Sequence, residues 1–264
     1  MKQILSIVFF SICSLVQSQS PYTLDLKKDL ILSGIGLGLA TSSKLVDNSI
    51  TPLSVSQINS LSKDNINAFD RGAVDNYNQW SGTVSDVAVY SCMASPLLLL
   101  PSKKIRKDIF IVGAMYGETL WYSFFLPAIA KGSIQRVRPF VYNPLAPLDK
   151  KQEIDAQRSF FSSHTAMAFS SAIFFSSVYS TYFPKSKLKP YIWGSSILIA
   201  SGVGFMRYNS GNHFPTDILV GAAIGGSIGY LIPHIHKSKS NSNLTVFPIV
   251  NEHHIELSMN YQFK

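Results

Sequence analysis

Charged residues and cysteines are scarce in this sequence. Only 14% of its 264 residues are charged, whereas about a quarter are charged in typical soluble domains. Because 46% of the residues are hydrophobic and the mean hydropathy is positive, this composition excludes an ordinary soluble domain. The two cysteines, Cys13 and Cys92, exclude a disulfide-rich scaffold, and we expect no internal disulfide. Much of the chain is therefore expected to lie in lipid.

Acidic residues are also fewer than basic ones, 15 against 23, which leaves a formal net charge of +8. Such a balance suits nucleic acid, anionic lipid or an anionic substrate as a partner. The Lys and Arg residues lie in short clusters between apolar runs, as they do in membrane proteins. We therefore expect a membrane and an anionic substrate, and no nucleic acid.

The first 18 residues have the pattern of a secretory signal peptide. Lys2 is followed by an apolar run, Ile4 to Val16, and by the small-residue cleavage pattern Val16-Gln17-Ser18. Cleavage would remove Cys13. The alternative is an uncleaved anchor helix, which the shortness of the apolar run disfavours.

Apolar runs of helical length follow at regular intervals. Five are long enough, or nearly so, to cross about 30 Å of hydrocarbon: Val84 to Leu100, Ile109 to Ala130, Thr165 to Phe183, Tyr191 to Met206 and Ile218 to Ile235. A sixth, Leu30 to Ala40, is short and Gly-rich, and crossing, interfacial and re-entrant placements all remain open.

These runs predict an all-α, polytopic membrane bundle over residues 83–236. Residues 19–82 are expected to form a polar and interfacial segment with one short apolar helix. In the tail, residues 237–264, apolar residues alternate from Ile255 to Phe263, which predicts a small β-hairpin about Asn251-Glu252.

The basic loops predict the orientation of the bundle. "PSKKIRKD", "PKSKLKP" and "HKSKS" fall on one side by the parity of the five spans, and the positive-inside rule makes that side cytoplasmic. The connections Lys131 to His164 and Arg207 to Asp217 then share the outer face of the cytoplasmic membrane. A cleaved signal agrees with this orientation only if Leu30 to Ala40 does not fully cross.

Three polar clusters meet on that outer face. Lys131 and Arg138 are two helical turns apart, and we expect one helix to carry both until Pro139 ends it. Ser162 and Ser163 precede His164 at the start of a span, and Arg207, His213 and Asp217 connect the last two spans; these residues make up the candidate site. Taken singly, such residues are usually interfacial anchors or helix caps. Together, three cations, helix-terminal amides, two imidazoles and one carboxylate suit the binding and transfer of a tetrahedral oxyanion.

The spacing Lys131-x₆-Arg138-Pro139, then Ser162-x-His164, then Arg207-x₅-His213-x₃-Asp217 resembles the three-part signature of the type 2 phosphatidic acid phosphatase family, PAP2. That family includes lipid phosphate phosphatases, class A acid phosphatases and vanadium haloperoxidases. The resemblance implies the family's helical core and roles for each matching residue.

By this resemblance the three cations, Lys131, Arg138 and Arg207, hold the phosphoryl oxygens, with Ser162 and the Ser163 amide as further donors. His213 is the nucleophile that forms a phosphohistidine, Asp217 orients it, and His164 protonates the leaving group. No metal ion and no cofactor are expected in this site. The sequence departs from the family pattern at Phe161, Ser163 and Met206, where Pro, Gly and Ser are usual.

The favoured function is a membrane phosphatase for a phosphate or pyrophosphate ester of a phospholipid or isoprenoid. Phosphatidic acid, phosphatidylglycerophosphate, undecaprenyl pyrophosphate and lipid A phosphate are all candidates, and the residues do not select a headgroup. Two alternatives are a periplasmic acid phosphatase for soluble monoesters and a non-catalytic protein that binds anionic lipid.

Four further features lie outside this signature. Asp86 is either a helix cap or a partner of a site cation, and Glu118, inside a span, is expected in a buried polar pair. His234 and His236 form a His-x-His pattern, which lacks the further ligands of a structural metal site. Glycines 221, 225 and 229 predict close helix packing that holds the corner between His213 and Asp217 rigid.

Overall fold

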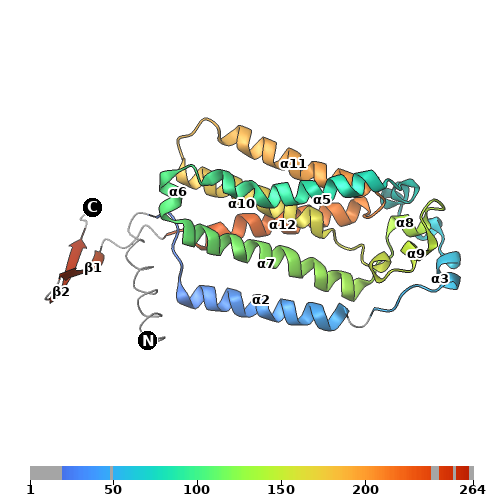
Figure 1. Cartoon of the computed structure of the whole chain (residues 1–264), viewed down its shortest axis with the longest axis horizontal. Coiled ribbons are helices and arrows are strands. Elements are labelled where there is room, and N and C mark those ends of the chain that lie inside the picture. The colour runs from blue at the N-terminus through green and yellow to red at the C-terminus, as the bar shows by residue number, and fades with distance from the viewer. Residues whose placement is uncertain (1–19, 48–49, 239–243, 252–253, 262–264) are drawn as a thin grey trace.

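The computed structural model describes residues 20–47, 50–238, 244–251 and 254–261. The proposed signal peptide therefore lies outside the described residues. Within them, six long helices lie side by side in one bundle (Figure 1): α2 (Leu26–Asp47), α5 (Gln79–Ala94), α7 (Ile109–Ile134), α10 (Ser163–Tyr182), α11 (Lys189–Asn209) and α12 (Pro215–Ile235). This arrangement confirms the all-α membrane bundle.

Length and composition make this a multi-pass membrane protein. The helical segments Leu26–Val46, Gln79–Leu99, Ile109–Tyr142 and Pro215–Ile235 are long and apolar enough to cross a membrane. The other two long helices, α10 and α11, have 20 and 21 residues and so reach about 30 Å. α10 is central, because it packs against α5, α7, α11 and α12. Its buried serines face other helices, which explains its lower apolar content.

The prediction that the first apolar run is short is wrong. The helix extends beyond Leu30 to Ala40 in both directions and has 22 residues as α2. It packs along α7, where Trp121 Nε1 donates to the Gly36 carbonyl at 2.8 Å and the Tyr122 hydroxyl donates to the Leu32 carbonyl at 2.6 Å. Val46, beyond the predicted end of the run, lies against Gly132 of α7, so the packing on α7 continues past the limit that hydropathy alone predicts.

The position at which α2 begins bears on the predicted orientation of the bundle in the membrane. The backbone of Tyr22 pairs with that of Lys237, and the Thr23 amide donates to the His236 carbonyl at 2.8 Å. The chain therefore enters α2 at the end of the bundle where α12 ends, which is the end with the basic loops. A cleaved secretory signal would place residue 22 outside the cell, whereas the positive-inside rule places this end inside. The two expectations cannot both hold.

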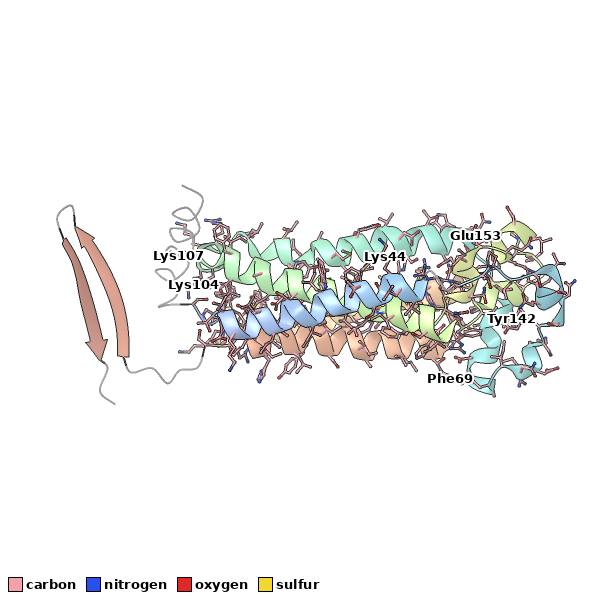
Figure 2. All side chains as sticks on the ribbon, turned by 90° about the horizontal axis from the view of Figure 1, so that it is seen from below. Lys44, Phe69, Lys104, Lys107, Tyr142 and Glu153 are labelled. Carbon is pink, nitrogen blue, oxygen red and sulfur yellow. The ribbon has the colours of Figure 1, made fainter. Side chains whose placement is uncertain are left out.

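Short helices close the two ends of the bundle. At the site end are α3 (Val55–Ser60), η2 (Lys63–Asn65), α4 (Ala68–Arg71), η3 (Gly72–Asp75), α8 (Pro139–Tyr142), α9 (Leu148–Lys151) and η5 (Ile154–Gln157). At the other end are η4 (Ser95–Leu99) and α6 (Lys103–Lys107). Figure 2 shows Lys104 and Lys107 at the opposite end from Phe69, Tyr142 and Glu153.

The helices at the site end form a cap with its own small core, which includes Leu53, Ile58, Phe140 and Val141. The polar segment that precedes the predicted span Val84 to Leu100 is thus a folded part of the site end. In the tail, β1 (Leu244–Asn251) and β2 (His254–Tyr261) pair antiparallel, with Leu244 opposite Tyr261 and Asn251 opposite His254.

Candidate active site

Three buried cations come together where α7 and α11 end. Lys131 lies in the last turn of α7, Arg207 lies in the last turn of α11, and Arg138 precedes α8. Their exposed fractions are 8%, 7% and 2%. Buried cations are costly unless they are paired, so this convergence indicates a site for an anion.

The expected single helix from Lys131 to Arg138 is wrong. α7 ends at Ile134, and Gln135 follows in a left-handed conformation with φ 48°. Pro139 begins the separate short helix α8. The turn lets Arg138 point back into the site, where its Nη1 donates to the Asn212 carbonyl at 3.0 Å.

Asp155 holds Arg138 in place. Arg138 Nε donates to the Asp155 carbonyl at 2.7 Å, and Nη2 donates to its carboxylate at 2.9 Å. Burial opposes ionisation of this carboxyl, but the charges of Arg138 and Lys131 outweigh it and lower the pKa of Asp155 to about 2. The connection between Lys131 and His164 thus contributes a carboxylate to the site.

His213 is fully buried beside this cluster, and its Nε2 lies 3.3 Å from Arg138 Nη1. A guanidinium can only donate, so Nε2 must accept and Nδ1 carries the proton of the neutral ring. Burial, reinforced by the charges of Arg138, Lys131 and Arg207, lowers the pKa of His213 well below its usual value. His213 is therefore a neutral imidazole with its Nε2 lone pair directed toward the cations.

Asp217 faces the other ring nitrogen of His213. The separation from Nδ1 to Asp217 Oδ2 is 3.6 Å, which is longer than a hydrogen bond, and Nδ1 has no other hydrogen-bond partner. Asp217 Oδ2 accepts from the Ser159 hydroxyl at 2.5 Å and from the Phe214 amide at 2.9 Å. The carboxylate thus caps α12 and also lies against His213. These are the positions expected of a helix cap and of the residue that orients His213.

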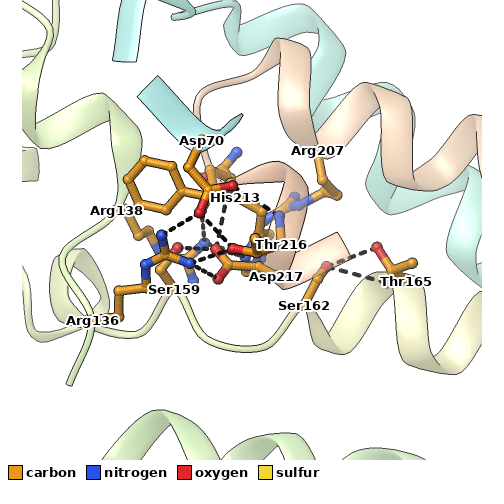
Figure 3. A network of polar contacts seen from close by, with 12 residues as sticks. Asp70, Arg136, Arg138, Ser159, Ser162, Thr165, Arg207, His213, Thr216 and Asp217 are labelled. Carbon is orange, nitrogen blue, oxygen red and sulfur yellow. Dashed lines mark hydrogen bonds and ion pairs between the residues drawn. The ribbon is translucent and has the colours of Figure 1, made fainter. Parts of the chain in front are cut away.

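A second arginine secures the far side of Asp217, as Figure 3 shows. Arg136 donates to Asp217 Oδ1 at 2.6 Å and to Asp70 Oδ2 at 2.7 Å, and its guanidinium lies 4.0 Å from the centre of the Phe214 ring. Asp70 also accepts from the Thr216 amide at 2.9 Å. Neither Arg136 nor Asp70 is among the site residues expected from the sequence, because no local spacing links residues so far apart.

His164 lies in the first turn of α10, which Ser162 caps by accepting from the Thr165 amide at 3.3 Å. Among the described non-glycine residues, Gln135 has the positive φ, so Ser163 occupies the position of the usual glycine without left-handed strain. His164 Nε2 lies 2.9 Å from Asp86 Oδ1, and the same oxygen accepts from Arg207 Nη1 at 3.1 Å. Asp86 is therefore a partner of site groups rather than only a cap.

Gly211 and Ser85 complete the frame of the site. Gly211 has φ 72°, and a Cβ there would meet the Asn76 carbonyl oxygen at 2.2 Å, so the turn before His213 requires glycine. The family pattern has Ser where this chain has Met206. Here the Ser85 hydroxyl, from α5, accepts from Arg207 at 3.1 Å.

A cavity of about 470 Å³ opens onto this cluster. Its lining includes Gln79, Thr83, Asp86, His164 and Arg207. Lys131, Arg138 and His213 are buried and do not line it. The structure thus brings His164 and Arg207 to the surface of the cavity and keeps the proposed nucleophile deeper.

The fold and site define an integral membrane protein with a buried, cation-rich anion site at one end of a helical bundle. A family model of the PAP2 superfamily matches residues 111–240, and this part of the chain belongs to that superfamily. This membership supports a phosphatase as the class of enzyme.

Comparison with individual proteins adds little. Among solved structures, the chain is similar to the transmembrane PAP2-type phosphatidylglycerolphosphate phosphatase from Bacillus subtilis. The identity is 23% and the TM-score 0.44, over 76% of this chain and 94% of that one. No curated protein matches the sequence.

Proposed function

We propose that this protein hydrolyses a phosphate or pyrophosphate ester of a membrane lipid through a phosphohistidine on His213. The observation that carries the proposal is the orientation of His213. Its Nε2 accepts from Arg138, and its Nδ1 side faces Asp217, so the nucleophilic lone pair lies among the cations that would hold the phosphoryl oxygens.

In the first step, His213 Nε2 attacks phosphorus and the bond from phosphorus to the lipid oxygen breaks. His164 supplies the proton that the leaving oxygen needs, and Lys131, Arg138 and Arg207 stabilise the negative charge on the three remaining oxygens. Asp217 stabilises the imidazolium character that develops on His213. In the second step, water attacks phosphorus and gives a proton to His164, and the bond from nitrogen to phosphorus breaks. Phosphate leaves, and the enzyme returns to its starting state.

The position of the cavity supports a lipid substrate. Gln79 and Thr83, which line the cavity, lie in the first turns of α5. Trp80 lies in the same turn and is 70% exposed, and tryptophan at a helix end is typical of the membrane–water interface. A headgroup at this depth enters the cavity while the acyl or isoprenoid chain stays in the bilayer.

We further propose that the site faces the outer side of the cytoplasmic membrane. The basic loops lie at the other end of the bundle, which supports a cytoplasmic position for that end. Since α2 also begins there, this orientation requires that the N-terminal apolar run does not act as a cleaved secretory signal.

Phosphate release from a panel of lipid and soluble esters tests the function. Purified wild type in detergent should hydrolyse lipid esters, and His213→Ala should lose all measurable turnover and all acid-labile labelling by a ³²P-substrate. His234→Ala is the matched control. His234 stacks on Tyr230 away from the site, so this variant should retain full activity. Unchanged release in His213→Ala would refute the mechanism, and release from soluble monoesters alone would refute the lipid substrate.

A further inference from the structure

A second polar cluster lies inside the bundle at the end opposite the phosphatase site. It consists of Asp29 from the first turn of α2, Glu118 from α7 and His236 at the end of α12. One side-chain ligand atom from each residue lies within 4.8 Å of the others. His236 is 1% exposed. None of the three takes part in the proposed phosphatase reaction.

The imidazole of His236 has a defined orientation. Its Nδ1 lies 2.9 Å from the Ile232 carbonyl oxygen, so this nitrogen carries a proton. Its Nε2 faces Asp29 Oδ1 at 2.9 Å and Glu118 Oε2 at 3.5 Å. In a neutral ring, Nε2 would direct a lone pair at two carboxylates, so a cation must lie between them. That cation is either a proton, held by the ring or by one of the carboxyl groups, or a metal ion.

The charge of the cluster favours the metal ion. A second proton on His236 neutralises one carboxylate and leaves one negative charge among the helices. Glu118 Oε2 is buried without a hydrogen-bond partner, which is costly for a charged oxygen in a membrane-spanning helix. A divalent cation would neutralise both carboxylates. Lys28, the residue before Asp29, directs its ammonium to the Ile235 carbonyl at 3.5 Å.

The distances also suit a metal. Ligand atoms about 2.0 Å from a tetrahedral zinc ion lie about 3.3 Å from one another. The separation of 3.5 Å from His236 to Glu118 matches this spacing, and the separation of 2.9 Å to Asp29 needs to open by a few tenths of an ångström. A backbone carbonyl that holds the other imidazole nitrogen is a common outer partner of a metal-bound histidine.

We propose that Asp29, Glu118 and His236 bind a divalent transition-metal ion of the zinc class, with water at the remaining position. One imidazole and two carboxylates are ligands that such ions accept. The ion would join the peripheral helix α2 to α7 and α12. His234, the other member of the His-x-His pattern, stacks on Tyr230 and is not a ligand.

Metal binding to the full-length protein in detergent tests the proposal. After treatment with a chelator, wild type should bind one more equivalent of Zn²⁺ than Glu118→Gln, and zinc should raise its unfolding temperature. Co²⁺ should give visible d–d bands in wild type that Glu118→Gln and Asp29→Asn lack. His234→Ala should behave as wild type does.

Asp29→Asn is the second variant in case Glu118→Gln misfolds. It should fold normally, because it changes a partly exposed side chain in the first turn of the peripheral helix. Phosphatase activity in both variants provides a check on folding that does not depend on the metal. Equal zinc stoichiometry in wild type and the two variants would overturn the proposal. So would cobalt spectra that are unchanged in both variants, or an absence of zinc binding to wild type at micromolar concentrations.

Discussion

The contact between α10 and α12 allows a sharp test of how the fold positions the catalytic groups. At Gly225, an added Cβ would lie 2.1 Å from the Ala166 carbonyl oxygen and 2.7 Å from its Cα. Because normal carbon–oxygen contacts are about 3.3 Å or longer, Gly225→Ala must separate the two helices by about 1 Å. Ser162 caps α10 and α12 carries Asp217, and the Ser162 amide donates to the Asp217 carbonyl at 3.1 Å.

We expect Gly225→Ala to lower kcat by about 100-fold, the typical effect of a 1 Å displacement of reacting groups, and to cost about 1–3 kcal/mol of stability. The assays are phosphate release and thermal unfolding in detergent. Gly226→Ala, whose Cβ would meet the flexible end of Ile173 at 3.1 Å, should have a smaller effect. Gly113→Ala, with nothing within 4 Å, should keep full activity and stability. Wild-type kcat and stability in Gly225→Ala would refute this account of the packing.

Three further predictions concern the site. Arg136→Ala leaves the buried carboxylate of Asp217 without its ion pair and should cost about 3 kcal/mol in thermal unfolding as well as most of kcat; unchanged values of both would contradict this role. Asp86→Asn removes a carboxylate that competes with phosphate for Arg207, so steady-state kinetics should show a KM lower by several-fold, and a higher KM would contradict the competition. The low pKa of His213 means that only the unfolded chain takes up this proton below about pH 6.5, so stability should fall as pH decreases from there. Unfolding scans should show a weaker pH dependence in His213→Gln, and an equal dependence would contradict the assignment.

The candidate site residues could be selected from the sequence because each motif is local. Lys131, Arg138, His164, Arg207 and His213 lie at or beside helix ends, and loop parity places those ends on one face. The small residues at Gly221, Gly225 and Gly229 predicted close packing, and a Cβ at any of them would meet the backbone of α10 within 2.7 Å.

The partners of these residues were not predictable in the same way. For Asp86 the sequence left a helix cap and a partner of a site cation both open, and the fold decided for the cation. Asp70, Asp86 and Asp155 come from three separate segments, and no spacing pattern relates them to the cations that they contact. From the sequence alone, a carboxylate before a span is interpreted as a helix cap or a surface residue. Only the fold shows which cation lies opposite it. The length of α2 also depended on tertiary structure, since Val46, beyond the predicted run, packs against Gly132 of α7.

The sequence by itself determined that this chain crosses a membrane as a helical bundle and that it carries the residue spacing of the PAP2 signature. Hydrophobic length and short motifs are local properties, and both can be read along the chain. Only the tertiary structure decided how the charges are balanced and which end of the bundle receives residue 22. It also decided that Asp29, Glu118 and His236 meet. These outcomes depend on contacts between distant segments, and such contacts form only when the helices pack.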